Sequence, residues 1–92
     1  MTLTDFLGLL AGTLTTLAFV PQVWRVWRTR STSDISMPMY AVFTSGTVAW
    51  LVYGMALGAL PVILANVVTT MLAASVIVMK LRFESAAARK NL

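Results

Sequence analysis

Residues 47–66 read TVAWLVYGMALGALPVILAN, two apolar and uncharged segments that meet between Gly58 and Pro61. Glycine and proline this close together mark a turn, and proline is well suited to the first turn of the next helix. A large aromatic ring, Trp50, and one amide, Asn66, stand in otherwise mostly apolar surroundings. A polar side chain in hydrocarbon is costly without a partner, so Asn66 is a candidate functional residue.

The composition of the chain predicts a membrane protein. Of its 92 residues, 59% are hydrophobic and 11% are charged, whereas about a quarter of a typical soluble domain is charged. Too few charged residues are present to supply the polar shell of a soluble protein of this size. We therefore expect residues 1–92 to form a single domain in contact with lipid.

The residue types also exclude several classes of function. The chain has no Cys and no His, and its acids are Asp5, Asp34 and Glu84. These residues supply neither a metal-ligand cluster nor a nucleophile with its base. We expect no enzyme, no metal and no cofactor. The net charge of +4 comes from basic residues that flank apolar spans, so we expect no nucleic-acid partner.

Three apolar spans cover most of the chain, and each is about as long as the hydrocarbon core is thick. They predict an all-α membrane protein of three transmembrane helices. We expect helices at about residues 3–24, 37–57 and 61–81, an aqueous loop over 25–36 and a frayed polar tail over 82–92.

The basic residues predict the orientation of these helices. They lie in the segments that follow the first and the third span. Each of these segments comes after an odd number of crossings, so both lie on the same side of the membrane. The basic residues are Arg25, Arg28, Arg30, Lys80, Arg82, Arg89 and Lys90. By the positive-inside rule, the N-terminus lies outside and the C-terminal tail is cytoplasmic.

Pro21 lies near the end of the first span, where its ring removes one backbone hydrogen bond and clashes with the preceding turn. We expect a kink near Ala18 to Pro21. The kink alone does not distinguish a static bend from a hinge.

Trp50 and Asn66 lie at similar depth. At 1.5 Å per residue, Trp50 lies about 18 Å from Pro38, at the start of its helix, and Asn66 lies about 22 Å from Leu81, at the end of its helix. Both of these helix ends are on the cytoplasmic side of the membrane. An indole can stack on an apolar ring face while an amide exchanges hydrogen bonds with hydroxyls. The pair predicts a neutral, hydroxyl-rich substrate, and the absence of charge from the interior of the spans favours passive facilitated diffusion.

Five threonines are candidates to add polar contacts, namely Thr13, Thr16, Thr47, Thr69 and Thr70. Threonine hydroxyls in membrane helices commonly bond to their own backbone instead, which is the stronger expectation.

Three helices cannot enclose a path for a solute, so a transporter of this size needs a second copy. The small-residue motifs Gly8-x-x-x-Gly12 and Gly54-x-x-x-Gly58 allow close helix packing. Because the charge bias inserts both copies the same way, we expect a parallel homodimer with its two-fold axis along the membrane normal.

Nearly the whole chain resembles the SemiSWEET group of bacterial sugar transporters in the PQ-loop superfamily. The resemblance rests on the Pro21-Gln22 dipeptide, the loop at residues 31–36, and the spacing of Trp50 and Asn66 in a three-helix chain. It implies a homodimer in the bacterial inner membrane that binds a mono- or disaccharide between paired Trp50 and Asn66. It further implies uniport-like transport by alternating access.

The same resemblance implies roles for other residues. Pro21, with Gln22, would be the hinge, Met39 and Phe43 the cytoplasmic gate, and Tyr53 the outer gate. Some relatives carry a basic and an acidic residue near the outer gate, where this chain has Leu57 and Ala59.

Two other functions fit parts of the pattern. A PQ-loop transporter could carry another small solute such as an amino acid, although a zwitterion favours charged or helix-end partners. The aromatic stripe of the second span and the small-residue motifs could instead serve assembly alone, in a membrane interaction module that transports nothing.

Overall fold

The computed structural model describes residues 2–90, and every regular element within them is an α-helix. The helices are α1 (Leu3–Leu17), α2 (Phe19–Thr29), α3 (Met37–Leu57) and α4 (Leu60–Lys90). Because α1 and α2 continue one another, the described residues contain three spans long and apolar enough to cross a membrane. The predicted all-α architecture of three spanning helices is confirmed.

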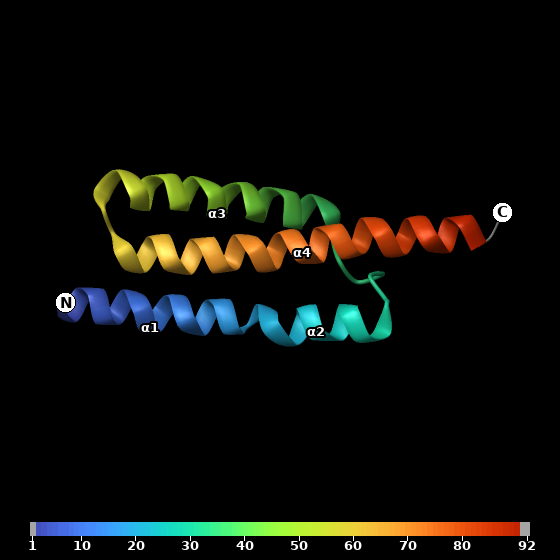
Figure 1. Cartoon of the computed structure of the whole chain (residues 1–92), viewed down its shortest axis with the longest axis horizontal. Helices are drawn as coiled ribbons and strands as arrows, with labels where there is room; N and C mark the ends of the chain where they lie inside the picture. Colours follow the sequence, from blue (N-terminus) through green and yellow to red (C-terminus); the bar gives the residue numbers. More distant parts are fainter. Residues whose placement is uncertain (1, 91–92) are drawn as a thin grey trace.

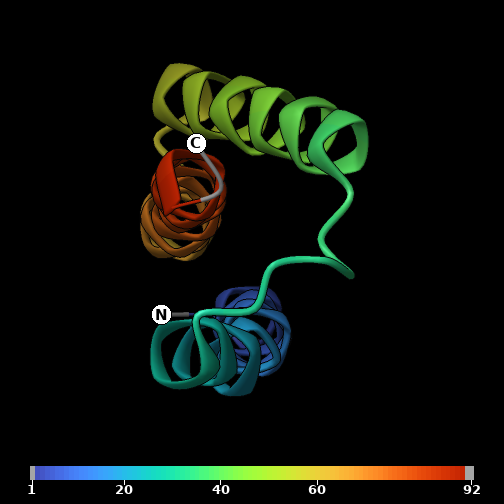
Figure 2. The same ribbon diagram turned by 90° about the vertical axis from the view of Figure 1, so that its right-hand side faces the viewer.

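Helix α4 forms the middle of the bundle, with α3 on one side and α1 and α2 on the other (Figure 2). The start of α1 and the α3–α4 turn lie at one end, and the α2–α3 loop and the last turns of α4 lie at the other (Figure 1). We refer to the latter as the basic end, because the loop, the end of α2 and the end of α4 carry all seven Lys and Arg.

The first span is broken at Ala18, inside the predicted kink. Pro21 has no N–H to donate to the carbonyl of Leu17, four residues earlier, and its ring crowds that carbonyl. Leu17 is the last residue of α1. The helix therefore breaks directly after Leu17, the residue whose carbonyl lacks a hydrogen-bond donor because of Pro21.

The predicted start of the aqueous loop at residue 25 is wrong. Helix α2 continues to Thr29, and Arg30 closes it in the left-handed conformation with φ of 60°, its N–H donating to the carbonyl of Val26. Val26 is fully buried, and burying it against α4 favours a helix that extends beyond the first arginine.

Helix α3 has the predicted bounds, because both of its ends are encoded locally. The Ser36 hydroxyl accepts a hydrogen bond from the backbone N–H of Met39 at 3.3 Å, and Pro38 occupies the first turn. Gly58 ends the helix with φ of 66°, a conformation that glycine adopts without strain. Helix α4 then begins at Leu60, one residue before the predicted start.

The predicted end of the last helix at residue 81 is also wrong, since α4 continues to Lys90. The Lys80 ammonium and the Glu84 carboxylate form an ion pair at 2.6 Å, one helical turn apart. Residues 86–88 are alanines, the strongest helix formers, and the basic residues at 89–90 suit the negative end of the helix dipole. The described part of the tail is thus helical rather than frayed.

Glycines let α1 approach α4 closely. A Cβ on Gly8 would lie 3.2 Å from Cβ of Pro61, and one on Gly12 would lie 2.6 Å from Cβ of Ala65. One turn further, the hydroxyls of Thr16 and Thr69 share a hydrogen bond of 2.8 Å. The first small-residue motif therefore packs helices within one chain.

The buried core lies towards the basic end and ties the α2–α3 loop to α4. Its buried apolar residues are Val26, Ile35, Tyr40, Ala73 and Val76. Lys80 is buried beside them, and its Nζ donates to the carbonyl of Thr32 at 3.0 Å. The guanidinium of Arg30 stacks on the rings of Trp27 and Phe83, 4.3 and 4.7 Å from their centroids.

Candidate functional site

Trp50 and Asn66 line one cavity of about 440 Å³, to which α1, α3 and α4 contribute. Its lining residues are Gly8, Ala11, Gly12, Thr15, Trp50, Pro61, Val62, Ala65, Asn66 and Thr69. All of them are uncharged, and most are small. The cavity thus combines one large aromatic surface with a few hydrogen-bonding groups.

The amide of Asn66 has a defined orientation. Its Nδ2 donates to the carbonyl of Val62 at 2.9 Å, and a carbonyl can only accept, so the nitrogen must face it. The side-chain oxygen and the second N–H proton have no partner within residues 2–90. Asn66 can therefore offer one acceptor and one donor to a ligand.

Trp50 lies on the side of α3 that its own chain leaves uncovered, with 56% of its surface exposed. Its ring meets that of Tyr53 edge to face, with 5.3 Å between the centroids. The two rings also line a second hollow of about 390 Å³ with Gly46 and Ala49. Tyr53 is one helical turn further from the basic end than Trp50.

Four of the five candidate threonines do not line this cavity. Thr13 donates to the carbonyl of Leu9 at 2.7 Å, as the expectation from membrane helices predicts. Thr13 and Thr16 line a separate groove of about 250 Å³ between α1 and α4. The hydroxyl of Thr70 donates to that of Thr47 at 2.7 Å and joins α4 to α3.

Among the threonines, Thr69 and Thr15 do line the cavity of Trp50. Thr15 did not stand out in the sequence, and its hydroxyl lies 3.2 and 3.1 Å from the carbonyls of Ala11 and Gly12. The helical spacing of Gly8, Gly12 and Thr15 places them on one face, which is the signal that could have identified it.

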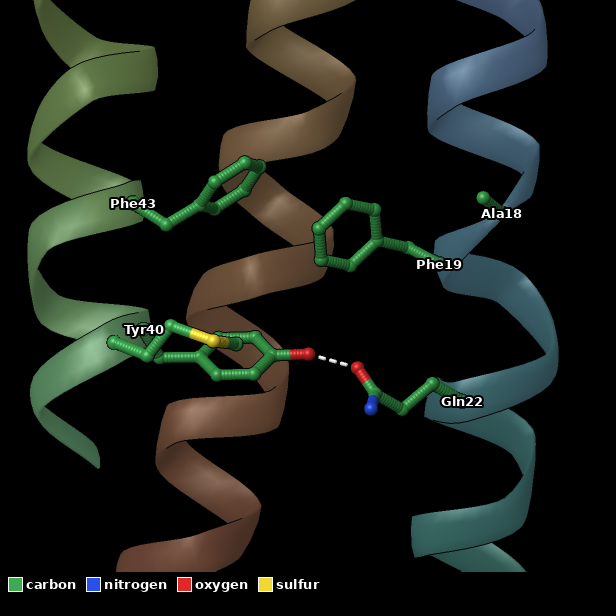
Figure 3. Close-up of a pocket in the computed structure, with 6 residues that line it drawn as sticks. Ala18, Phe19, Gln22, Tyr40 and Phe43 are labelled. Carbon is green, nitrogen blue, oxygen red and sulfur yellow. Dashed lines mark hydrogen bonds between the residues drawn. The ribbon is translucent and has the colours of Figure 1, made fainter. Parts of the chain in front are cut away.

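Another cavity, of about 350 Å³, lies between α2 and α3 towards the basic end (Figure 3). It contains Gln22, Met39 and Phe43, to which the family resemblance assigns roles in the hinge and the cytoplasmic gate. The other lining residues are Ala18, Phe19 and Tyr40. The structure thus places Gln22, next to the predicted hinge at Pro21, beside the two residues of the predicted cytoplasmic gate.

Side chains bridge α2 and α3 across this cavity. The rings of Phe19 and Phe43 face each other with 5.2 Å between their centroids. Next to them, the Tyr40 hydroxyl donates to the side-chain oxygen of Gln22 (Figure 3). Sequence reasoning missed Phe19 and Tyr40, although Phe19 stands three residues before Gln22 and Tyr40 three residues before Phe43, the spacing of one helical face.

Charge is confined to the ends of the spans. Residues 35–79 contain no charged side chain. At the basic end the Arg25 guanidinium pairs with Asp34 at 2.6 Å, and this hydrogen bond holds the pKa of the Asp34 carboxyl below its usual value. Within residues 2–90, no three His, Cys, Asp or Glu side chains come close enough to hold a metal ion.

Comparisons with known proteins agree with this architecture. Residues 3–63 match the PQ loop repeat family. The sugar transporter SemiSWEET of Bradyrhizobium diazoefficiens is 44% identical over 81 residues, which cover 88% of this chain and 94% of that protein. The sugar transporter SemiSWEET of Leptospira biflexa is 52% identical over 65 residues, 71% of this chain and 76% of that protein.

Solved structures show the same fold. A SemiSWEET crystal structure in the inward-open conformation superposes with a TM-score of 0.86 at 37% identity, and the match covers 99% of this chain and 98% of that one. A crystal structure of a bacterial homologue of SWEET transporters gives a TM-score of 0.85 at 35% identity, covering 89% and 99%.

Proposed function

The chain belongs to the SemiSWEET group of the PQ-loop family, and from this premise we propose that it carries mono- or disaccharides across a membrane by facilitated transport. It is a transporter and not an enzyme. The observation that carries the proposal is that Trp50 and Asn66 line the same uncharged cavity.

The chemistry of the cavity suits a neutral sugar. The face of the Trp50 indole stacks on the C–H surface of a pyranose ring. The Asn66 oxygen accepts a hydrogen bond from one sugar hydroxyl, and its second N–H donates to another. A zwitterionic amino acid would leave both of its charges without a partner among these residues, which disfavours the amino-acid alternative.

Alternating access would use the break in the first span. We assign the hinge to Pro21 and the gate at the basic end to Met39 and Phe43, with Gln22 beside them. The contacts from Phe19 and Tyr40 support this assignment, because side chains rather than closely packed backbones join α2 to α3 there.

Tyr53 would close the other mouth. Next to it, Leu57 and Ala59 cannot form an ion pair. Closure at this mouth would therefore rely on the aromatic ring of Tyr53 and on apolar packing.

A second copy would complete the transport path. Trp50 and Tyr53 lie half exposed on an uncovered side of α3, and a parallel homodimer would bring the equivalent side of a partner chain against it. We place the N-terminus outside and the basic end in the cytoplasm, by the positive-inside rule, in the inner membrane of a bacterium.

Transport into proteoliposomes tests the site. We expect labelled glucose or sucrose to enter vesicles that contain the wild type. Trp50→Ala should raise the half-saturation concentration about tenfold through the lost stacking. Asn66→Ala should lower uptake as well, since one donor and one acceptor are lost.

Matched controls separate the site from general damage. Val52→Ala changes an exposed residue of α3, and Ser75→Ala removes a hydroxyl that bonds only to its own helix. Both controls should transport like the wild type. Unchanged uptake in both Trp50→Ala and Asn66→Ala would contradict the site assignment. Sugar binding measured by calorimetry in detergent would exclude the interaction-module alternative, and competition by amino acids alone would favour an amino-acid substrate.

A further inference from the structure

An exposed stripe runs along the outside of α4. Its apolar members, at helical spacing, are Val67, Met71 and Val78, each between 36% and 67% exposed. The buried residues of α4 occupy the opposite side of the helix: Thr69, Ala73, Val76 and Lys80. The stripe therefore faces away from α1, α3 and the Trp50 cavity, and in a membrane it contacts acyl chains.

The same stripe becomes cationic where α4 leaves the hydrocarbon. About 20 residues cross a core of roughly 30 Å, so a helix that begins at Leu60 reaches the headgroups near Lys80. Arg82, Ser85 and Arg89 continue the spacing of the stripe from Val78. Together with Leu81 and Ala86 they line a hollow of about 540 Å³.

The acidic residues of the chain cannot neutralise these arginines. At the basic end, Asp34 pairs with Arg25 and Glu84 pairs with Lys80, each at 2.6 Å. Asp5, the remaining acid, lies in the first turn of α1 at the opposite end. Within residues 2–90, Arg82 and Arg89 thus have no acidic partner and are free to bind an external anion.

We propose that this stripe binds one anionic phospholipid in the leaflet at the basic end. One acyl chain lies along Met71 and Val78, and the headgroup phosphate sits between Arg82 and Arg89. The Ser85 hydroxyl, between the two arginines on the same face, donates a further hydrogen bond. Two guanidinium groups suit the planar recognition of a phosphate. The apolar stripe below them selects a lipid over a free phosphate ion. This proposal is independent of which substrate the cavity carries.

Lipid retention measured by native mass spectrometry tests the proposal. The full chain is purified in detergent with an equimolar mixture of phosphatidylglycerol and phosphatidylcholine. We expect the wild type to retain phosphatidylglycerol preferentially. Arg82→Gln and Arg89→Gln should each weaken that retention about fivefold, as expected for one basic residue at an anionic surface. Free glycerol phosphate should neither bind nor displace the lipid.

Arg28→Gln is the matched control, because it removes the same charge from α2, at the same end but off the stripe. It should retain phosphatidylglycerol like the wild type. An equal loss in Arg28→Gln and Arg82→Gln would overturn the proposal in favour of a diffuse charge effect. Equal retention of the two lipids by the wild type would also overturn it. Ser85→Ala, which leaves the charge unchanged, should weaken retention by a smaller factor than either arginine variant.

Discussion

Lys80 carries a charge among buried side chains, with 9% of its surface exposed. A lysine is seldom buried without partners, and here the ammonium group has two, the Thr32 carbonyl and the Glu84 carboxylate. The first partner belongs to the α2–α3 loop and the second to α4 itself. One side chain thus holds the loop against the helix that forms the middle of the bundle.

Replacing this lysine should destabilise the protein. In Lys80→Met the Thr32 carbonyl loses its donor while it stays buried, which costs about 1–3 kcal/mol. Thermal unfolding in detergent measures the change. Lys90→Met removes the same type of side chain from an exposed position and should shift stability by less than about 0.5 kcal/mol. Equal melting temperatures for the two variants would show that the Thr32 contact contributes nothing.

At the level of single residues, the sequence singled out the two residues of the candidate cavity that stand out chemically. Trp50 and Asn66 do so because a large ring and an amide are rare in uncharged spans. Thr15 and Tyr40 do not stand out. A threonine hydroxyl commonly bonds to its own helix, and the sequence does not show which neighbouring helix a tyrosine faces. The rotation of each helix about its axis, which packing on α4 determines, decides between these possibilities.

At the scale of helices, the first span is two pieces joined at Ala18. If the bend serves as a hinge, Pro21→Ala should restore the missing backbone hydrogen bond, stiffen the span and slow sugar uptake in proteoliposomes. Accessibility of cysteines introduced at the two mouths of the path would report the conformation directly. Full transport with unchanged accessibility would identify the bend as purely structural.

The close approach of α1 to α4 makes a second prediction. Gly12→Ala would place a Cβ 2.6 Å from Cβ of Ala65, and the resulting displacement should cost about 1–3 kcal/mol. Gly46→Ala is the matched control, since no atom lies within 4 Å of the added Cβ. In the interior of α3 it should stabilise the protein by up to about 1 kcal/mol. Denaturation of both variants in detergent measures the difference, and equal destabilisation would contradict the contact.

The sequence predicted helix ends where a local signal encodes them and failed where tertiary packing decides. Ser36 caps the start of α3 and Gly58 ends the helix in the left-handed conformation, so both limits of α3 were predictable. Helix α2 runs past Arg25 because Val26 is buried against α4. Helix α4 runs past Leu81 because the Lys80–Glu84 pair and three alanines favour helix over a solvated tail.

At the scale of the whole molecule, one chain leaves the Trp50 side of α3 uncovered, and we expect two chains to associate there. Two differently tagged copies, produced in the same cells and solubilised in mild detergent, should purify together. Light scattering corrected for detergent should give a protein mass of twice the 10.0 kDa of one chain. A protein mass of one chain, with full transport in vesicles, would contradict the dimer.

The uncharged cavity between α1 and α3 has an energetic consequence for the cell. Moving one elementary charge through the membrane potential changes its energy by about 2.3 kcal/mol per 100 mV. A neutral sugar has no charge on which this potential could act, and neither have residues 35–79. Flux should therefore be independent of voltage and stop when the sugar concentrations on the two sides are equal. Under the proposed function, net uptake of sugar by a cell would continue only as fast as metabolism removes the sugar.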